Sequence, residues 1–292
     1  MFKIGCHVSA AGGVWNAPKN AADLECEIFQ IFTRPPMGGP APKILEADIE
    51  RFKSEMEKYK FSEFVVHAPY IVNFGSAKKT TFHGSISVVS EELVRANSLG
   101  ASLLMIHMGS FKDLGQEKGM EQAKKGFIAV LNKYEASAKI IKTKFLLEIA
   151  AGAGEVIGDT FEELAELMEP LLKYKSFGGI CFDTQHAFSG GYDFRTPKTA
   201  AETFKKFDKA IGLKWLKMSH VNDSKVPLGG RKDRHEHIGE GEIGEKGFSA
   251  FMKFLISNYK FQNKSSFPLI LETEHDKVKE DIKILKKLRE KI

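Results

Sequence analysis

The chain has 292 residues, of which 42% are hydrophobic and 28% are charged, and its formal net charge is +5. These values are ordinary for a globular protein and exclude disordered and fibrous chains. The sequence has no run of about 18 apolar residues, and its N-terminus lacks the segments of a signal peptide, so we expect a cytoplasmic protein with no membrane partner. The positive charge is compatible with a phosphate-rich partner but is weak evidence by itself.

Apolar, β-branched and aromatic runs alternate with segments of helical periodicity along the whole chain. Strands are predicted at residues 2–8, 27–33, 63–68, 102–108, 144–149, 179–183, 213–220 and 268–272. Helical periodicity is clear at residues 86–99, 117–138, 161–174, 199–210, 246–258 and 277–289. The alternation predicts an α/β fold, a single (β/α)8 TIM barrel that comprises residues 1–292, with a doubly wound open sheet as the alternative.

Three cysteines, Cys6, Cys26 and Cys181, lie far apart and form no C-x-x-C motif. An odd, scattered set argues against a disulfide framework and against a thiolate zinc site. We therefore expect buried, reduced thiols.

Several predicted strands end on a residue type that binds metals. The six residues are His67, His107, Glu148, Asp183, His220 and Glu272. Each alone has another explanation, since a histidine can be a structural hydrogen-bonding residue, a glutamate can belong to an ion pair, and Asp183 can cap the next helix. In a barrel, however, all strand C-termini open on one face, which predicts that the six side chains converge there in an active site.

Converging carboxylates need cations to balance them, and imidazole with carboxylate is the ligand mix of zinc and similar metals. Residues 219–239 read S-H-V-N-D-S-K-V-P-L-G-G-R-K-D-R-H-E-H-I-G. Within this segment, Asp233 and His235 can chelate one ion together with His186. A solvated loop is the alternative, and spacing alone leaves His237 open in place of His235. We expect His7 near the site, and His83 and His275 at the surface or at a helix start.

Residues 151–158 follow a strand with the pattern G-x-G-x-x-x-G, which is one residue off the dinucleotide fingerprint. We therefore expect no nucleotide cofactor. The sequence also lacks a G-x-S-x-G nucleophile motif, which argues against covalent nucleophilic catalysis.

Several motifs resemble the endonuclease IV family of zinc-dependent apurinic/apyrimidinic endonucleases, in the order that this family has them. They are F-Q-I-F-T at 29–33, H-A-P-Y at 67–70, H-M-G-S at 107–110, D-T-Q-H at 183–186, H-V-N-D-S-K at 220–225, D-R-H at 233–235 and L-E-T at 271–273. The resemblance implies a (β/α)8 barrel that binds three Zn²⁺ ions. It implies a base excision repair enzyme, a hydrolase that cuts double-stranded DNA 5′ to an abasic site and leaves a 3′-hydroxyl and a 5′-deoxyribose phosphate. A monomer is the family expectation.

Carried over by position, the resemblance assigns each ligand to an ion. A first zinc is held by His67, His107 and Glu148, and a third by His186, Asp233 and His235. Glu148 also bridges to the second zinc, which is held with Asp183, His220 and Glu272, and Glu148 and Glu272 are the implied catalytic residues. Three zinc ions against four carboxylates leave a charge of about +2, which suits a phosphodiester and its more negative transition state.

The resemblance assigns a DNA-contacting wedge to the loop that holds Tyr70 and Ile71, whose side chains would fill a gap in distorted DNA. The candidate phosphate contacts are Arg34, Arg231, Lys232 and Arg234, for which plain solvated charge is the alternative. The chain departs from the family in the loop at 34–40, which reads R-P-P-M-G-G-P where R-N-P-R-x-W is usual, so that Met37 supplies an apolar side chain instead. The residues that follow Glu148 and Glu272 also differ from those usual in the family. None of these differences removes a metal ligand.

Two other functions are considered. Metal-dependent sugar isomerases or epimerases of the xylose-isomerase-like barrel type place similar residues at strand ends, but for one or two ions, so a count of about three zinc ions would discriminate against them. A nucleic-acid binder without activity would require broken ligands, and the ligand set is intact.

Overall fold

The barrel closes between the two ends of the chain. The computed structural model describes residues 2–258 and 266–292. Eight parallel strands form a closed barrel in the order β1-β10-β7-β6-β5-β4-β3-β2, in which β1 pairs with both β10 and β2. This closure confirms the predicted (β/α)8 barrel and excludes the open sheet. The barrel strands are β1 (Phe2–His7), β2 (Ile28–Ile31), β3 (Val65–His67), β4 (Leu103–Ile106), β5 (Lys144–Glu148), β6 (Phe177–Asp183), β7 (Leu216–His220) and β10 (Phe267–Leu271).

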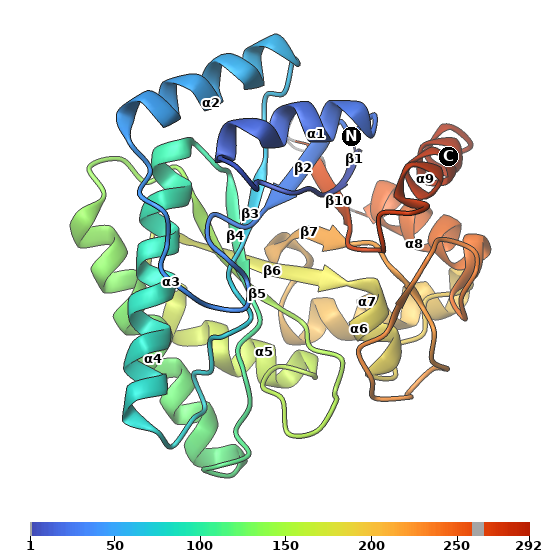
Figure 1. The fold of residues 1–292 in the computed structure, drawn as a ribbon. Coiled ribbons are helices and arrows are strands. Elements are labelled where there is room, and N and C mark those ends of the chain that lie inside the picture. Colours follow the sequence, from blue (N-terminus) through green and yellow to red (C-terminus); the bar gives the residue numbers. More distant parts are fainter. Residues whose placement is uncertain (1, 259–265) are drawn as a thin grey trace.

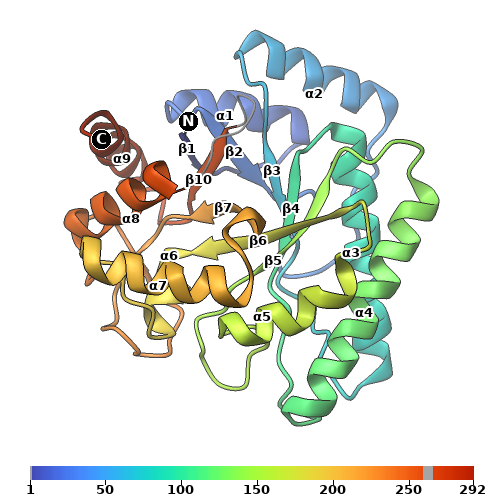
Figure 2. The same ribbon diagram turned by 180° about the vertical axis from the view of Figure 1, so that it is seen from behind.

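Helices surround the barrel, as Figures 1 and 2 show from opposite sides. They are α1 (Ala17–Asp23), α2 (Glu46–Lys58), α3 (Lys79–Leu99), α4 (Gln116–Ser137), α5 (Phe161–Met168), α6 (Thr184–Ser189), α7 (Pro197–Ala210), α8 (Gly244–Asn258) and α9 (Val278–Glu290). The described residues also form three short 3-10 helices, η1 (Val14–Asn16), η2 (Glu169–Leu171) and η3 (Leu213–Trp215), and a small hairpin of β8 (Asp223–Ser224) and β9 (His235–Glu236). None of the helices described is long and apolar enough to cross a membrane.

The structure corrects several predicted boundaries. The helix predicted at 161–174 divides into α5 and η2, because Pro170 lacks the amide hydrogen that the α-helix would need. The strand predicted at 213–220 begins only at Leu216, after η3. The helix predicted at 86–99 begins earlier, at Lys79. Helices α1, α2 and α6 and the β8–β9 hairpin are additions to the predicted elements.

The barrel interior is filled by one side chain from each of seven strands. These residues form a separate, fully buried cluster: Ile28, Val65, Met105, Leu146, Cys181, Met218 and Ile270. Their strand neighbours, such as Phe145 and Leu147, belong to the larger core under the helices. Because strand side chains alternate between faces, the residue two positions after each interior residue also points inward, one layer closer to the strand C-termini.

Candidate metal centre

The layer above the interior core is polar. Counting two residues beyond each interior residue gives Gln30, His67, His107, Glu148, Asp183, His220 and Glu272, and β1 ends with His7. All six predicted strand-end ligands are therefore in this layer, where the strand C-termini converge. The remaining two positions hold His7 and Gln30.

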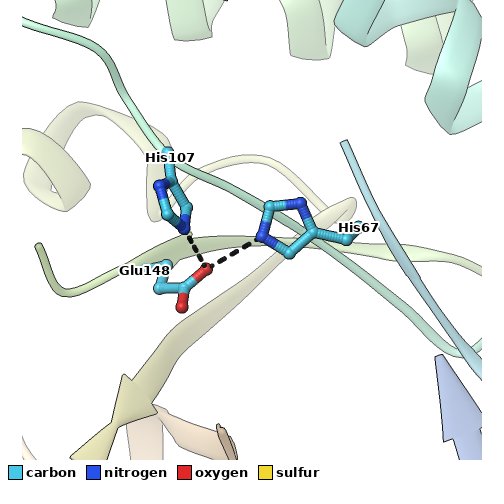
Figure 3. Close-up of side chains that lie close together, drawn as sticks. All are labelled: His67, His107 and Glu148. Carbon is cyan, nitrogen blue, oxygen red and sulfur yellow. Dashed lines mark ion pairs between the residues drawn. The ribbon is translucent and has the colours of Figure 1, made fainter. Parts of the chain in front are cut away.

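The first group comprises His67, His107 and Glu148, whose side chains point toward one another (Figure 3). The Nε2 atoms of His67 and His107 lie 3.3 and 3.4 Å from Glu148 Oε2. His67 and Glu148 are only 1% exposed. In the described part of the chain, His67 Nε2 and Glu148 Oε2 have no hydrogen-bond partner, although both are buried. Buried polar atoms are rarely left without a partner, so these atoms fit a site that a cation completes.

A second group adjoins the first through Glu148. Ligand atoms of Glu148, Asp183, His220 and Glu272 lie within 4.8 Å of one another. His220 Nδ1 is 2.6 Å from Glu148 Oε1, 3.4 Å from Glu272 Oε2 and 3.9 Å from Asp183 Oδ2. Glu148 thus turns one oxygen to each group. Cys181 also approaches His220 Nδ1, at 3.7 Å, but burial raises the pKa of its thiol to about 12, which keeps it protonated.

The third group combines α6 with the β8–β9 hairpin. Asp183, His186 and His235 have ligand atoms within 4.8 Å of one another, and the Asp233 carboxylate lies 3.4 Å from His186 Nε2 and 3.3 Å from His235 Nε2. Asp183 also caps α6, because its Oδ1 accepts a hydrogen bond from the His186 amide at 2.8 Å. The cap and the ligand interpretations of Asp183 are therefore compatible.

His237, which spacing alone left open, points away from this group. Its Nδ1 lies 2.7 Å from Asp281 Oδ2 in α9, and the same carboxylate accepts a hydrogen bond from the Ile238 amide at 2.9 Å. His237 therefore ties the end of the hairpin to helix α9.

Backbone carbonyls orient two of the histidines. His67 Nδ1 lies 2.6 Å from Ala68 O and His186 Nδ1 lies 2.9 Å from Ile149 O. A carbonyl only accepts, so each Nδ1 carries a proton, and Nε2 is the ring nitrogen that faces the site and would bind a metal. Among the described residues, the Nε2 atoms of His67, His186 and His235 are buried without a hydrogen-bond partner. Metal-binding histidines are commonly oriented in this way, by a hydrogen bond from the ring nitrogen that faces away from the metal.

Opposite charges in the cluster shift pKa values strongly. Burial alone would raise the pKa of Glu148, but His220 and His107 hold it well below its usual value. Burial would lower the pKa of His186, but Asp183 and Asp233 raise it to about 10. Outside the ligand set, burial lowers the pKa of His7 to about 3, so that His7 is neutral. The carboxylates are thus negatively charged, and they favour a second proton on His186, which a divalent transition metal bound to that imidazole would replace.

The predicted DNA contacts lie in different surroundings. Tyr70 and Ile71 are 48% and 43% exposed, and the Tyr70 ring packs against His67 and His107. Met37 is 80% exposed on the neighbouring loop. The Tyr70 amide donates to Pro36 O at 3.0 Å, and a Cβ placed on Gly38 would lie 3.4 Å from Ile71 Cγ2. Met37, Tyr70 and Ile71, here called the apolar ridge, therefore stand together at the rim of the site.

The four predicted basic contacts divide into two kinds. Lys232 and Arg234 are exposed beside Asp233, and Arg231 is exposed but bonded to Asp159 at 2.6 Å. Arg34 is buried, and its guanidinium pairs with Glu92 at 2.6 Å and Glu91 at 2.7 Å. A phosphate contact by Arg34 would therefore compete with these two ion pairs, and the DNA contact of Arg34 stays a prediction.

A cavity of about 830 Å³ lies beside the metal centre, between the segment that follows β1 and the loop that follows β2. The cavity is lined by residues that include Trp15, Pro36, Ile44 and Arg95. His7 and Phe32 line it on the side of the metal centre. None of the predicted metal ligands lines it. The cavity is a neighbour of the site and not the site itself.

Comparison with known proteins decides the family. The chain matches the xylose isomerase-like TIM barrel family over residues 18–288. It is 39% identical, over 99% of both chains, to the probable endonuclease 4 of Nitrosopumilus maritimus (strain SCM1). The chain belongs to the endonuclease IV family.

Solved structures agree with this assignment. Endonuclease IV from Thermus thermophilus superposes with a TM-score of 0.82 at 28% identity, over 99% of this chain and 100% of that one. A D-tagatose 3-epimerase-like protein has a TM-score of 0.75 at 20% identity, over 99% of this chain and 97% of that one. At that identity the second likeness shows the shared fold alone.

Sequence reasoning misses two buried amides in the site of this endonuclease IV family member. Gln30 contacts His220 and Glu272, and Asn222 donates to Asp183 Oδ2 at 2.8 Å while accepting from the Glu272 amide at 2.8 Å. Both lie within sequence motifs of the family, F-Q-I-F-T and H-V-N-D-S-K. An amide is a poor metal ligand beside carboxylate and imidazole, so a search for ligand types passes over it.

Proposed function

We propose that this chain is a zinc-dependent AP endonuclease that hydrolyses the phosphodiester bond 5′ to an abasic site in double-stranded DNA, leaving a 3′-hydroxyl and a 5′-deoxyribose phosphate. The full-length identity to a probable endonuclease 4 supports the reaction class. The observation that carries the proposal is the set of three adjoining ligand groups, in which Glu148 joins the first to the second and Asp183 reaches the second and the third.

Three zinc ions would be held by the groups described above, with Asp233 completing the third. Zinc supplies a Lewis acid, which polarises a phosphoryl oxygen and makes water a stronger nucleophile at neutral pH. The chain's own part is to fix the spacing. Glu148 does so by presenting Oε1 to His220 and Oε2 to His67 and His107. The buried layer also excludes bulk water, which strengthens each electrostatic contact to the phosphate.

Binding of duplex DNA is assigned to the rim of the site. The apolar ridge offers side chains that can enter a distorted duplex at the missing base, where unstacking costs least. Lys232 and Arg234 are exposed beside Asp233 and provide positive charge for the flanking phosphates, with Arg231 next to them. Arg34 is left out of this proposal, because its positive charge is paired with the carboxylates of Glu91 and Glu92.

Sugar isomerisation is the less supported function. An isomerase that uses one or two ions would leave His186, Asp233 and His235 without a use, although the Asp233 carboxylate lies within 3.4 Å of both imidazoles. The likeness to the epimerase-like protein concerns the fold alone.

The proposal is tested with a labelled DNA duplex that carries one stable tetrahydrofuran analogue of an abasic site, beside an undamaged duplex of the same sequence. We expect the zinc-loaded protein to cut only the damaged strand, immediately 5′ to the analogue. A strong chelator should abolish the cut, and added zinc should restore it. If fully zinc-loaded protein leaves the damaged duplex intact, the proposed function is wrong, and sugar substrates become the next assay.

A further inference from the structure

Gln30 is a completely buried amide at the end of β2, in the same layer as the ligands. Its side chain contacts three members of that layer. His220 Nε2 lies 2.8 Å from Gln30 Oε1, while Gln30 Nε2 lies 2.6 Å from Glu272 Oε1 and 3.0 Å from His7 Nδ1. Gln30 therefore uses its carbonyl oxygen and both amide hydrogens on the second ligand group and its neighbour.

The chemistry of the partners fixes which end of the amide faces which residue. An ionised carboxylate only accepts hydrogen bonds, so the amide atom 2.6 Å from Glu272 must be the NH₂ group. The carbonyl oxygen then faces His220, and because this oxygen only accepts, His220 Nε2 must carry a proton. By the same reasoning, His7 Nδ1 accepts the second amide hydrogen, as a neutral imidazole can.

His220 is thereby left with Nδ1 as its only nitrogen for a metal. That atom faces the other ligands, 2.6 Å from Glu148 and 3.4 Å from Glu272. His67 and His186 are held in the opposite way, with Nδ1 protonated and Nε2 free. Their partners are backbone carbonyls, whereas the partner of His220 Nε2 is a side chain that substitution can remove.

We propose that Gln30 is a positioning residue for the second metal group, which sets His220 to bind through Nδ1 and holds Glu272 by Oε1 so that Oε2 stays available. The inference rests on the metal centre of the proposed function. It assigns no contact between Gln30 and the DNA or the ions. One amide thus orients two ligands that lie at the ends of the paired strands β7 and β10.

The wild-type protein gives the first test. Ring nitrogens of the nine histidines are observed by long-range ¹H–¹⁵N correlation in ¹⁵N-histidine-labelled, zinc-loaded protein, with His220 assigned by comparison with His220→Gln. We expect His220 to be protonated at Nε2, and His67 and His186 at Nδ1. A proton on His220 Nδ1 would overturn the proposal, and this readout requires no substitution at Gln30.

The second test is Gln30→Met, which keeps the length of the side chain and removes all three hydrogen bonds. Competition with a chromophoric zinc chelator should show about 10–100-fold weaker binding of one zinc ion, as expected when a hydrogen bond that orients a metal ligand is lost, with the other two ions retained. Gln185→Met is the matched control, because Gln185 is equally buried but bonds to Lys232 O and approaches Ser224. It should leave the His220 signals unchanged.

Unaltered zinc affinities in Gln30→Met would contradict the proposal, as would an equal disturbance of His220 by Gln185→Met. Neither readout uses DNA, so an enzyme that holds zinc but fails to cut abasic DNA would refute the proposed reaction and leave this inference standing. A wild-type chain that binds no zinc would overturn both.

Discussion

Seven of the eight barrel strands place a residue of the polar layer by the same local rule, two positions beyond the side chain that fills the barrel interior. Leu146 precedes Glu148, Cys181 precedes Asp183, and the alternation of side chains along the strand places both on the inner face. The rule makes the six strand-end ligands predictable from sequence, because an apolar run followed by His, Asp or Glu is visible there. Gln30 obeys the same rule, but its role depends on which atoms it meets across the barrel, and that is not visible in the sequence.

A substitution at Glu272 tests the second group. Glu272→Gln removes the negative charge and one metal-binding oxygen but keeps the shape of the side chain. We expect turnover on the abasic duplex to fall by at least about 100-fold, since losing a ligand costs no less than losing a hydrogen bond that orients one. DNA affinity, measured by fluorescence anisotropy, should change little, because Glu272 lies inside the barrel and not on its rim. The exposed Glu274→Gln carries the same charge change and should cut normally. Full activity in Glu272→Gln would mean that Glu272 does not hold a metal.

At the scale of elements, strands with long apolar runs were predictable and the β8–β9 hairpin was not. Its strands have two residues each, too few to show any periodicity. In the structure His235 reaches the third group, while His237, just past β9, bonds to Asp281 in α9. The sequence of helix α2 does contain a helical pattern, since its buried Ile49 and Phe52 are spaced three apart. At the start of this helix, Asp48 accepts a hydrogen bond from the Leu45 amide.

The loop after β2 and the segment after β3 act together as the apolar ridge, and Met37 is its most exposed member. Met37→Ala shortens the ridge without disturbing the core. We expect kcat/KM on the abasic duplex to fall by about 3–10-fold, as the loss of roughly 1 kcal/mol of apolar contact implies. Ile140→Ala is the control, because Ile140 is 68% exposed in the segment before β5, at the opposite end of the barrel. An equal loss of kcat/KM in both variants, or no loss in Met37→Ala, would show that the apolar ridge does not contribute to DNA binding.

At the scale of the whole molecule, the alternation of strands and helices does not reveal closure, since an open sheet shows the same order. Closure depends on contacts between the two ends of the chain. Ile4 lies opposite Leu269 in the β1–β10 ladder. Arg289 in α9 bonds to both oxygens of Glu27, at 2.6 and 2.9 Å, and Glu27 also accepts from the Ile4 amide at 3.0 Å. The bidentate ion pair thus fastens the last helix to Glu27, directly before β2, and Arg289 also donates to the Phe2 carbonyl of β1 at 2.9 Å.

Arg289→Met should therefore loosen the closed barrel. Side-chain exposures of 17% for Arg289 and 32% for Glu27 reduce the strength of the pair, so we expect a loss of about 1–2 kcal/mol, or about 2–5 °C in the melting temperature. Lys287→Met removes a charge from the exposed side of the same helix and should melt like the wild type.

The same pair predicts how stability depends on pH. Although burial raises the pKa of Glu27, Arg289 and the Ile4 amide hold it below the usual value of 4.5. A carboxyl whose folded pKa is lowered contributes stability above its unfolded pKa and loses that contribution as the pH falls through the folded pKa. The difference in melting temperature between wild type and Arg289→Met should therefore be full above about pH 5 and shrink toward acid pH. A difference that stays constant down to about pH 3 would show that Arg289 stabilises the closure by packing and not by its charge.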